Sequence, residues 1–455
     1  MQRPLVQTQC LQTQFLQTHF MQTPPMQTAT DILDTFESLG WKANDPMAQT
    51  LQLRAHDPKA LGGLVVQALD RELKHATFID AALDLMDDDS YFAAVHAAWQ
   101  RALQGARSDM LCEVLDSAAL QYPDVFASDW NAYLHAVHAG EGGPEYLADQ
   151  AWRALDATTS ADWCATLEDD VSDGALGRTR AIALLRSRRP QAVQQAWLRL
   201  FPTPDALAQS WLHLAGYASH DGGLRALHSE RPLHIGFSAS QRKLMLADQP
   251  AWRRDVQKAH PTWNASATPV SQARMGGLLP SICGHCHAPL HRLLSMNDPA
   301  VAGIASATPL DFATCLSCQG WHIDGAMFYR HDAEGAPHAH PSQRQQAASA
   351  PDYVADALLD ADVQLFTAPS RWAWQDWGQS NATQNLNRVG GAPSWVQSAD
   401  YPACPDCQQD MNFVMQLDSG LPQADGGQWL WGSGGCNYTF WCAGCRVSGH
   451  LWQCT

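Results

Sequence analysis

Apolar residues in the first half of the chain recur at the spacing of a buried helix face. From Leu61 to Leu73 they fall at steps of three and four residues, which is the period of one side of an α-helix. Similar segments follow, separated by short loops rich in Asp, Gly, Pro or Ser: 78–86, 91–103, 110–120, 130–137, 146–155, 181–185, 192–201 and 207–214. The pattern predicts an all-α domain over residues 30–262, with Thr30 as the N-cap of its first helix.

The spacing of these helices also indicates how they pack. Helices that start every 16 to 20 residues or so, with short loops between them, favour stacked antiparallel pairs, as in a HEAT-like helical repeat. No clean sequence repeat is present, so an irregular bundle is the alternative. Two acidic clusters, Asp87–Asp89 and Glu168–Asp170, are interpreted as helix caps and solvated loop charges, with an acidic docking edge as the other interpretation.

The helical pattern ends near Trp263, where short alternating runs replace it. Residues 429–431 and 438–441 alternate in a context rich in Gly and Trp, which is typical of β-hairpins. The predicted fold class is therefore α+β and multidomain, with an all-α, helical-repeat-like half followed by a β-rich half. No segment is apolar for the roughly 18 residues that a membrane-spanning helix needs.

Four Cys-x-x-Cys pairs lie in the β-rich half and form two matching sets. The sets are Cys283 and Cys286 with Cys315 and Cys318, then Cys404 and Cys407 with Cys442 and Cys445. A Gly-Gly dipeptide precedes each set, and an apolar run follows the first pair of each. These correspondences predict an internal duplication, with zinc-ribbon-like lobes at 263–335 and 352–455 joined by a polar linker at 336–351.

Four thiolates on two tight turns form the tetrahedral set that closes a structural zinc site. The sequence therefore predicts two structural Zn²⁺ ions, one in each lobe. A closed shell leaves no position for a reactive water, so these sites are expected to stabilise the fold without catalysing a reaction. Disulfides or free thiols are the alternative. The N-terminus lacks the basic and apolar stretches of a signal peptide, which predicts a cytoplasmic protein with reduced thiols.

Other residues near the cysteines are candidates for a role in the sites. Several histidines are interpreted as surface or supporting residues: His285, His287, His291, His322, His331, His338 and His340. A histidine ligand, His285 or His287, in place of one cysteine is disfavoured while four thiolates are available. Cys436 and Cys454 are interpreted as packing or spare thiols. The alternative makes Cys436 a nucleophile with His450 as its base.

The formal net charge is −17, and it is unevenly distributed. No lysine follows Lys258, and the residues beyond it contain seven arginines against fifteen acidic residues. Such a surface repels phosphate backbones and anionic membranes, so neither nucleic acid nor a membrane is the expected partner. It favours a basic protein partner, with Trp372, Trp374 and Trp377 as candidate aromatic anchors.

The first 29 residues follow a different pattern. Gln-Thr recurs with a period of five residues from Gln7 to Thr28, which matches neither the helix nor the strand repeat. We expect a disordered low-complexity tail. It is interpreted as a translated DNA repeat upstream of a start at Met21 or Met26, with a binding arm as the alternative.

The C-terminal lobe carries its motifs in a characteristic order. Gly390-Gly391 and Trp395 precede the Cys404 pair, and Gln416 and then Tyr438-Thr-Phe-Trp-Cys442 follow it. This order resembles the YwqG-like bacterial domain of unknown function, and it is similar to the C-terminal zinc domain of the programmed cell death protein 2 family. The resemblance implies a β-rich zinc domain that binds proteins and has no catalytic residues. It also implies two roles, an immunity protein against a secreted toxin or an escort for a ribosomal protein.

Together these features predict a non-enzymatic zinc-binding protein that acts by binding a basic protein. An immunity protein that neutralises a basic secreted toxin is the first specific hypothesis. An escort or assembly factor for a basic cellular protein is the second. A thiol- or metal-dependent enzyme is the third.

Overall fold

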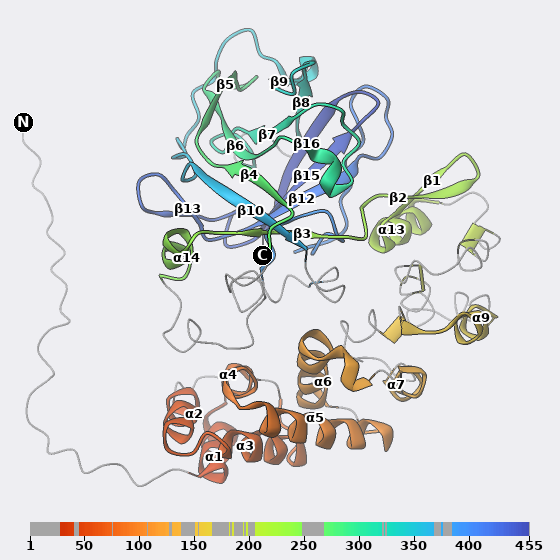
Figure 1. The fold of residues 1–455 in the computed structure, drawn as a ribbon, viewed down its shortest axis with the longest axis vertical. Coiled ribbons are helices and arrows are strands. Elements are labelled where there is room, and N and C mark those ends of the chain that lie inside the picture. The colour runs from red at the N-terminus through yellow and green to blue at the C-terminus, as the bar shows by residue number, and fades with distance from the viewer. Residues whose placement is uncertain are drawn as a thin grey trace, which may run out of the picture.

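The computed structural model contains a helical half and a sheet-bearing half (Figure 1). It describes residues 28–40, 45–74, 76–106, 108–126, 130–137, 151–152, 154–165, 182, 184–185, 194, 197–198, 205–247, 268–320, 323, 325–367, 375 and 385–454. Within these ranges, no helix combines the length and the apolar character that crossing a membrane requires. Some predicted features lie outside them: the Gln-Thr tail up to residue 27, Glu168–Asp170, His322, and Trp372, Trp374 and Trp377.

The helices predicted from hydrophobic spacing are present where the structure describes their segments. Those in the first half are α1 (Ala29–Leu39), α2 (Asp45–His56), α3 (Ala60–Asp70), α4 (Thr77–Leu85), α5 (Asp88–Leu103), α6 (Asp109–Gln121), the 3₁₀ helix η2 (Pro123–Phe126), α7 (Trp130–Val137), α9 (Ala157–Ala165) and α13 (Ala206–Ala215). Helices α3 to α7 and α13 confirm the corresponding predictions, because their apolar faces coincide with the predicted segments.

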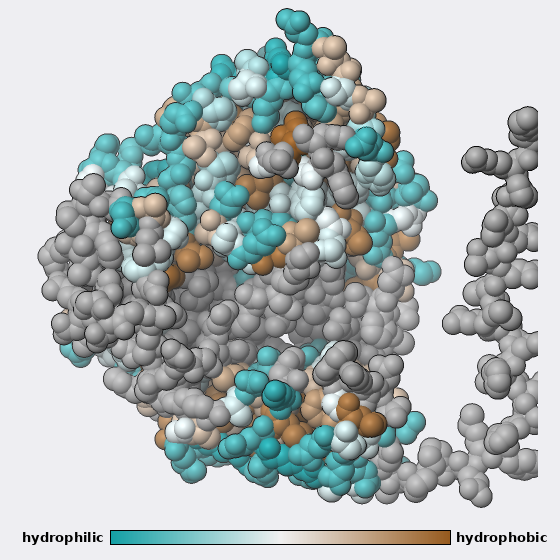
Figure 2. All heavy atoms as spheres, turned by 180° about the vertical axis from the view of Figure 1, so that it is seen from behind, coloured by the Kyte–Doolittle hydropathy of each residue, from teal (hydrophilic) through white to brown (hydrophobic). Residues whose placement is uncertain are grey.

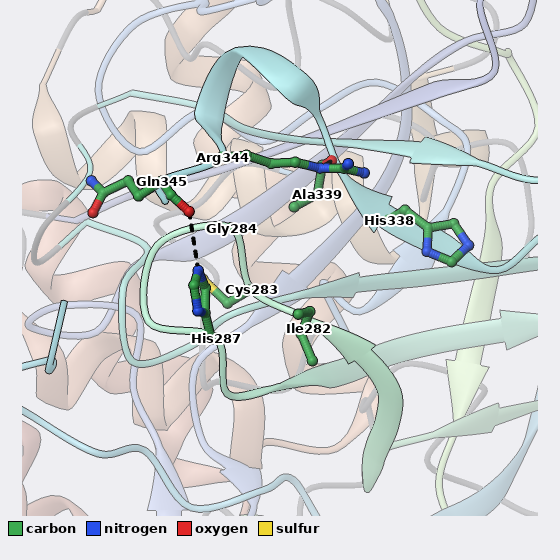
Figure 3. Close-up of a pocket in the computed structure, with 8 residues that line it drawn as sticks. All are labelled: Ile282, Cys283, Gly284, His287, His338, Ala339, Arg344 and Gln345. Carbon is green, nitrogen blue, oxygen red and sulfur yellow. Dashed lines mark hydrogen bonds between the residues drawn. The ribbon is translucent and has the colours of Figure 1, made fainter. Parts of the chain in front are cut away.

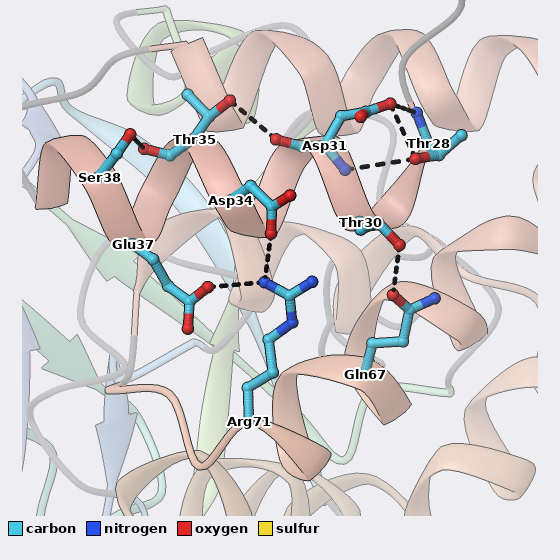
Figure 4. Close-up of polar contacts among 9 residues, drawn as sticks. All are labelled: Thr28, Thr30, Asp31, Asp34, Thr35, Glu37, Ser38, Gln67 and Arg71. Atoms are coloured by element: carbon cyan, nitrogen blue, oxygen red, sulfur yellow. Dashed lines mark hydrogen bonds and ion pairs between the residues drawn. The ribbon is translucent and has the colours of Figure 1, made fainter.

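The first helix begins earlier than predicted. Thr28 is its N-cap: the Thr28 hydroxyl accepts a hydrogen bond from the Asp31 backbone at 3.3 Å, and the Asp31 carboxylate accepts one from the Thr28 backbone at 2.8 Å (Figure 4). This reciprocal capping box satisfies two N–H groups that the helix start leaves open. The choice of Thr30 as the cap was therefore wrong, and residues 28 and 29 belong to the helical domain and not to the tail.

The helices pack in two rows. Helix α3 contacts α1 and α5, α5 contacts α7, and α2 contacts α4. Arg71 links the first and third helices through ion pairs of 2.7 Å to Asp34 and 2.6 Å to Glu37 (Figure 4). Asp87 caps α5 by accepting a hydrogen bond from the Ser90 backbone at 2.9 Å, which confirms the cap interpretation for that residue. Two rows of helices are compatible with a helical repeat, and the HEAT-like assignment stays a prediction.

Antiparallel strands dominate the second half. The elements are β1 (Tyr217–His220), β2 (Gly223–Ala226), β3 (Leu233–Gly236), α14 (Ala239–Met245), β4 (Ser271–Met275), β5 (Leu278–Ile282), β6 (Pro289–Met296), η4 (Pro299–Ala302), β7 (Leu310–Thr314), β8 (Met327–His331), β9 (Pro337–Ala339), η5 (Pro341–Gln343), β10 (Ala361–Thr367), β11 (Arg388–Val389), β12 (Asn412–Asp418), β13 (Leu421–Pro422), β14 (Gln428–Trp429), β15 (Cys436–Cys442) and β16 (Val447–Gln453).

Twelve of these strands form one sheet. Its order is β5-β6-β4-β10-β3-β11-β12-β15-β16-β8-β9, and β7 pairs with β6 beside this path. The sheet curls so that its first and last strands, β5 and β9, contact each other. Strands of the first lobe lie at both ends of the path and strands of the second lobe lie between them, because β10 pairs with β4 and β16 pairs with β8. The two lobes therefore share a single sheet and are not separate units.

The boundaries of the predicted domains differ from the structure in two places. Residues 217–236, placed in the helical domain, form the β1–β2 hairpin and β3, and β3 lies in the middle of the sheet between β10 and β11. The predicted linker at 336–351 contains β9 and η5, and its His340 side chain is buried. β3 is ordered by β10 and β11, which are distant in sequence, so local composition does not report its place. The strand β9 pairs with the neighbouring β8 in a local hairpin, which its linker-like composition does not indicate.

The duplication predicted from the Gly-Gly dipeptides has a structural counterpart. Gly276 and Gly390 both have positive φ, at 77° and 71°, and so does the glycine that follows each of them. A Cβ atom would lie 2.2 Å from the Leu359 carbonyl oxygen at Gly276 and 2.4 Å from the Ser229 hydroxyl at Gly390. Both turns therefore require glycine, for conformation and for space.

Candidate metal centres

The first set of cysteines is assembled by two loops of the sheet. Cys283 and Cys286 lie in the turn between β5 and β6, and Cys315 and Cys318 directly follow β7, the strand that pairs with β6. The four Sγ atoms all lie within 4.8 Å of one another. Strand pairing brings the two turns together, so the geometry of the centre follows from the register of β6 and β7.

The second set repeats this arrangement at another place in the same sheet. Cys404 and Cys407 precede β12, and Cys442 and Cys445 form the turn between β15 and β16. Their four Sγ atoms also lie within 4.8 Å of one another. The eight cysteines predicted as ligands are therefore brought together in the two predicted groups of four.

The spacing of the sulfur atoms fits a tetrahedral zinc ion. Zinc–sulfur bonds of about 2.3 Å at a tetrahedral angle place neighbouring sulfurs about 3.8 Å apart. The Sγ atoms of Cys286 and Cys315 are 3.6 Å apart, and those of Cys407 and Cys442 are 3.7 Å apart. Each centre can thus hold a metal ion with four thiolates, and the preference of such a set for Zn²⁺ comes from its chemistry.

The backbone of the first turn in each centre is the same. The Cys283 amide donates to Ala288 O, and the Cys404 amide donates to Gln409 O, each at 2.8 Å. The residue after the second cysteine has positive φ in both turns, 58° at His287 and 61° at Gln408. Amides that close such a turn hold both sulfurs on one side of it. The duplication therefore extends to the conformation of the metal-binding turns.

Charge explains why these thiols need a cation. In the first centre, hydrogen bonds from Cys315 and Cys318 lower the pKa of Cys283 to about 2. The hydrogen bond to Cys283, together with burial, raises the pKa of Cys318 far above its usual range. Four sulfurs this close cannot all be thiolates without a positive charge between them. A divalent cation held by the four cysteines would supply that charge and displace the remaining protons.

A segment of the predicted linker covers the first centre. Residues 340–349, here called the strap, lie over the Cys283–Cys286 turn: Gln345 N donates to Gly284 O at 2.9 Å, and Ser349 N donates to His285 O at 3.0 Å. The His287 ring donates to Gln345 O at 3.2 Å (Figure 3). A cavity of about 280 Å³ remains beside the strap, between Ile282, His338 and Arg344. Sequence reasoning missed the strap, because no motif marks it.

The strap also contacts the second centre. His340 and Arg330 both bind the Asp406 carboxylate, at 3.1 Å and 2.6 Å, and Asp406 lies inside the Cys404–Cys407 turn. One segment thus links the two metal-binding turns. His338 pairs with Asp332 at 2.9 Å. The linker histidines therefore hold carboxylates, and neither belongs to the two four-cysteine groups that the described residues form.

The histidines around the first lobe support the sheet. His291 accepts a hydrogen bond from Leu316 N and donates to Ala355 O, so it fixes the loop that carries Cys315 and Cys318. His331 donates to Gly335 O at 3.0 Å and contacts the Ser448 hydroxyl at 2.9 Å. Both described groups of metal-ligating residues consist of cysteine alone. The interpretation of His291 and His331 as supporting residues is confirmed.

The structure does not assemble the alternative thiol dyad. Thr439 lies opposite His450 in the β15–β16 ladder, so the two side chains share a face of the sheet. Cys436 is three residues before Thr439 and therefore points to the other face. Its thiol is buried and contacts Asp418 at 3.7 Å, whereas His450 binds Thr439 and Ser448. Cys436 and His450 cannot act as nucleophile and base, and Cys436 and Cys454 are both free thiols.

No family model matches the chain, and no solved structure matches it. The chain is similar to an uncharacterized protein YpfL of Salmonella typhimurium strain LT2, with 26% identity over 176 residues, which covers 38% of this chain. The matched region is 39% of the length of that relative. The relative is uncharacterized, so it supplies no function to compare.

Single cysteine substitutions are expected to separate ligands from other thiols. Cys404→Ser and Cys442→Ser should each reduce bound zinc from two ions per chain to one or fewer, because three thiolates no longer close the shell. The matched controls are Cys112→Ser and Cys164→Ser, which change thiols of the helical half. These variants should keep two zinc ions per chain. Elemental analysis of reduced protein makes the measurement. Full zinc content in Cys404→Ser protein would contradict the assignment.

Buried histidines are expected to make the sheet sensitive to acid. Burial lowers the pKa of His331 to about 4 and those of His234 and His450 to about 3. Histidine in the unfolded chain titrates near pH 6.5, so below that pH the unfolded state binds protons that the folded state does not. Stability is therefore full above pH 6.5 and falls toward pH 4, by up to about 4 kcal/mol per pH unit for three such groups.

Urea unfolding between pH 7.5 and 5.5, with zinc content checked at each pH, measures this effect. His450→Gln should reduce the slope of stability against pH, and His220→Gln, at an exposed position, is the matched control. A slope that is the same in all three proteins would show that these histidines are not the cause.

Proposed function

We propose that this chain is a non-enzymatic, zinc-containing protein whose sheet-bearing half binds a basic partner protein. The observation that carries the proposal is the pair of closed four-cysteine centres, which leave no open coordination position for a substrate or a reactive water. The absence of lysine beyond Lys258 supports a cationic partner, because the acidic residues there outnumber the arginines by about two to one.

An exposed apolar patch on the sheet-bearing half suits such a partner. Tyr353, Val354 and Leu430 are 46%, 75% and 48% exposed. The Tyr353 ring stacks on Trp429 with centroids 6.4 Å apart, which joins the two segments that form the patch. Exposed carboxylates flank it: Asp352, Asp356 and Asp425. An apolar centre with a charged rim is the usual composition of a protein-binding surface.

The surface view shows a difference between the two halves of the molecule. In Figure 2 the outer edge of the helical half is mainly hydrophilic, whereas hydrophobic residues are interspersed with polar ones on the described surface of the other half. Single exposed apolar residues are common on any protein, so the argument rests on the ring contact that joins Tyr353 to Trp429, the residue before Leu430.

Affinity capture at two salt concentrations tests the proposal. The full chain should retain a basic protein, and the association rate should fall as salt rises past about 0.15 M, where the Debye length is roughly 8 Å. A double variant, Val354→Ala with Leu430→Ala, should weaken binding, and Val301→Ala, at another exposed position, should not. Retention of acidic partners only, independent of salt, would contradict the charge argument.

The identity of the captured protein separates the specific hypotheses. A secreted toxin domain would support an immunity protein, which the resemblance to the YwqG-like domain suggests. A ribosomal or other basic cellular protein would support an escort or assembly factor. A thiol- or metal-dependent enzyme is the remaining class, and its test is a substrate-dependent activity of the zinc-loaded chain that is lost when the metal is removed.

A further inference from the structure

We propose that the second metal centre is a site of oxidative modification: a peroxide oxidises Cys407 first, and this centre releases its metal while the first centre keeps its own. The inference goes beyond partner binding. It rests on both centres holding zinc, which elemental analysis establishes before the experiment. The oxidation proposal does not depend on partner binding, so it would stand even if the proposed partner-binding role were disproved.

The two centres differ in solvent access. In the first, Cys283, Cys315 and Cys318 are completely buried, and Cys286 is half-buried. In the second, Cys404 is the one completely buried ligand. Cys407 is exposed, and Cys442 and Cys445 are half-buried. Zinc-bound thiolates remain nucleophilic, and their rate of oxidation follows their accessibility.

The strap contributes to the lower solvent access of the first centre. It lies so close to the first turn that a Cβ atom at Gly284 would be 2.9 Å from Gln343 O. In the second centre, the Cys442–Cys445 turn has open space beside it, because a Cβ atom at Gly444 would have no neighbour within 4 Å. The strap contacts the second centre through the pair of His340 with Asp406, and Cys407 is exposed there.

The distances allow a complete reaction with hydrogen peroxide. The Cys407 thiolate attacks one peroxide oxygen, the O–O bond breaks, and the other oxygen leaves as hydroxide. The Cys442 thiolate, 3.7 Å away, then forms a disulfide with Cys407 and displaces hydroxide from its sulfur. Two electrons pass from the two thiolates to the peroxide, and solvent protons convert both hydroxides to water. Cys404 and Cys445 alone no longer close a four-thiolate shell.

Zinc release from the intact protein tests the proposal. Zinc-loaded full-length protein is treated with hydrogen peroxide, released zinc is followed with a chromogenic chelator, and oxidised cysteines are located by mass spectrometry. One zinc per chain should leave at least about tenfold faster than the other. The Cys407–Cys442 disulfide should form at the rate of the faster release. The chelator without peroxide measures spontaneous loss.

Variants of the strap provide a second measurement that does not alter any ligand. Gln345→Ala with Ser349→Ala removes side chains that bind each other and His285. It should accelerate release from the first centre and leave the second unchanged. Gln346→Ala, at a neighbouring exposed position, is the matched control. Equal rates of release from both centres, or oxidation of Cys283 or Cys436 before Cys407, would overturn the proposal.

Discussion

Removal of both metal ions is expected to unfold the sheet-bearing half and to leave helices α1 to α6 folded. Structural zinc contributes about 10–16 kcal/mol to small zinc domains. This exceeds the total stability of about 5–15 kcal/mol that is typical of a domain. Both centres lie on loops of one continuous sheet, so their loss affects the sheet as a whole. The helices have their own hydrophobic core, which contains none of the eight ligands.

Circular dichroism during titration with a strong chelator, under reducing conditions, measures this result. The helical signal should persist while near-ultraviolet signals from buried Trp431 and Trp441 disappear. Zinc returned in slight excess over the chelator is the control for reversibility. Simultaneous loss of helical and sheet signals, or retention of both, would show that the metal does not stabilise the sheet selectively.

Arg388→Ala is expected to cost about 3–5 kcal/mol, because it leaves several buried acceptors without a donor. The Arg388 guanidinium is completely buried, and burial lowers its pKa to about 10. It donates to Gln375 Oε1 at 3.2 Å and to Ser394 Oγ at 2.9 Å, and it also binds the Ala392 carbonyl. These bonds tie the segment after β11 to the centre of the sheet.

Arg388→Lys distinguishes charge from geometry in the same experiment. A lysine keeps the charge but lacks the planar set of donors, so it should recover only a small part of the lost stability. Arg344→Ala removes an exposed arginine and is the matched control. Urea unfolding followed by tryptophan fluorescence gives the free energies. A change below about 1 kcal/mol for Arg388→Ala would contradict the role assigned to this side chain.

The metal centres could be predicted from the sequence because their chemistry is local. Two cysteines in a Cys-x-x-Cys turn are positioned by a few backbone hydrogen bonds, such as that between Cys404 and Gln409. Pairing the turns correctly required only their order along the chain. The helices were predictable for a similar reason, since the spacing of apolar residues within each segment reflects the face that it buries.

The arrangement of the sheet could not be predicted in this way. β3 is a run of four residues in a passage without regular alternation, and its place is fixed by two strands far along the chain. The strap is polar and contains several residues typical of linkers, yet His340 is buried against Asp406, 66 residues away. Pairings between distant segments decide both features, and composition carries no information about them.

The central position of β3 has a consequence for biosynthesis. The Ile235 carbonyl accepts a hydrogen bond from Asn385 across 150 residues of sequence, so β3 leaves the ribosome long before the strands that flank it. Proteins rich in such non-local contacts fold slowly, because a large loop must close before the contacts form. All four cysteines of the first centre are synthesised before β10, whereas the second centre is completed only after β15. The first set of four cysteines is therefore complete in the nascent chain before the second, and we expect the first centre to be able to take up a metal ion earlier.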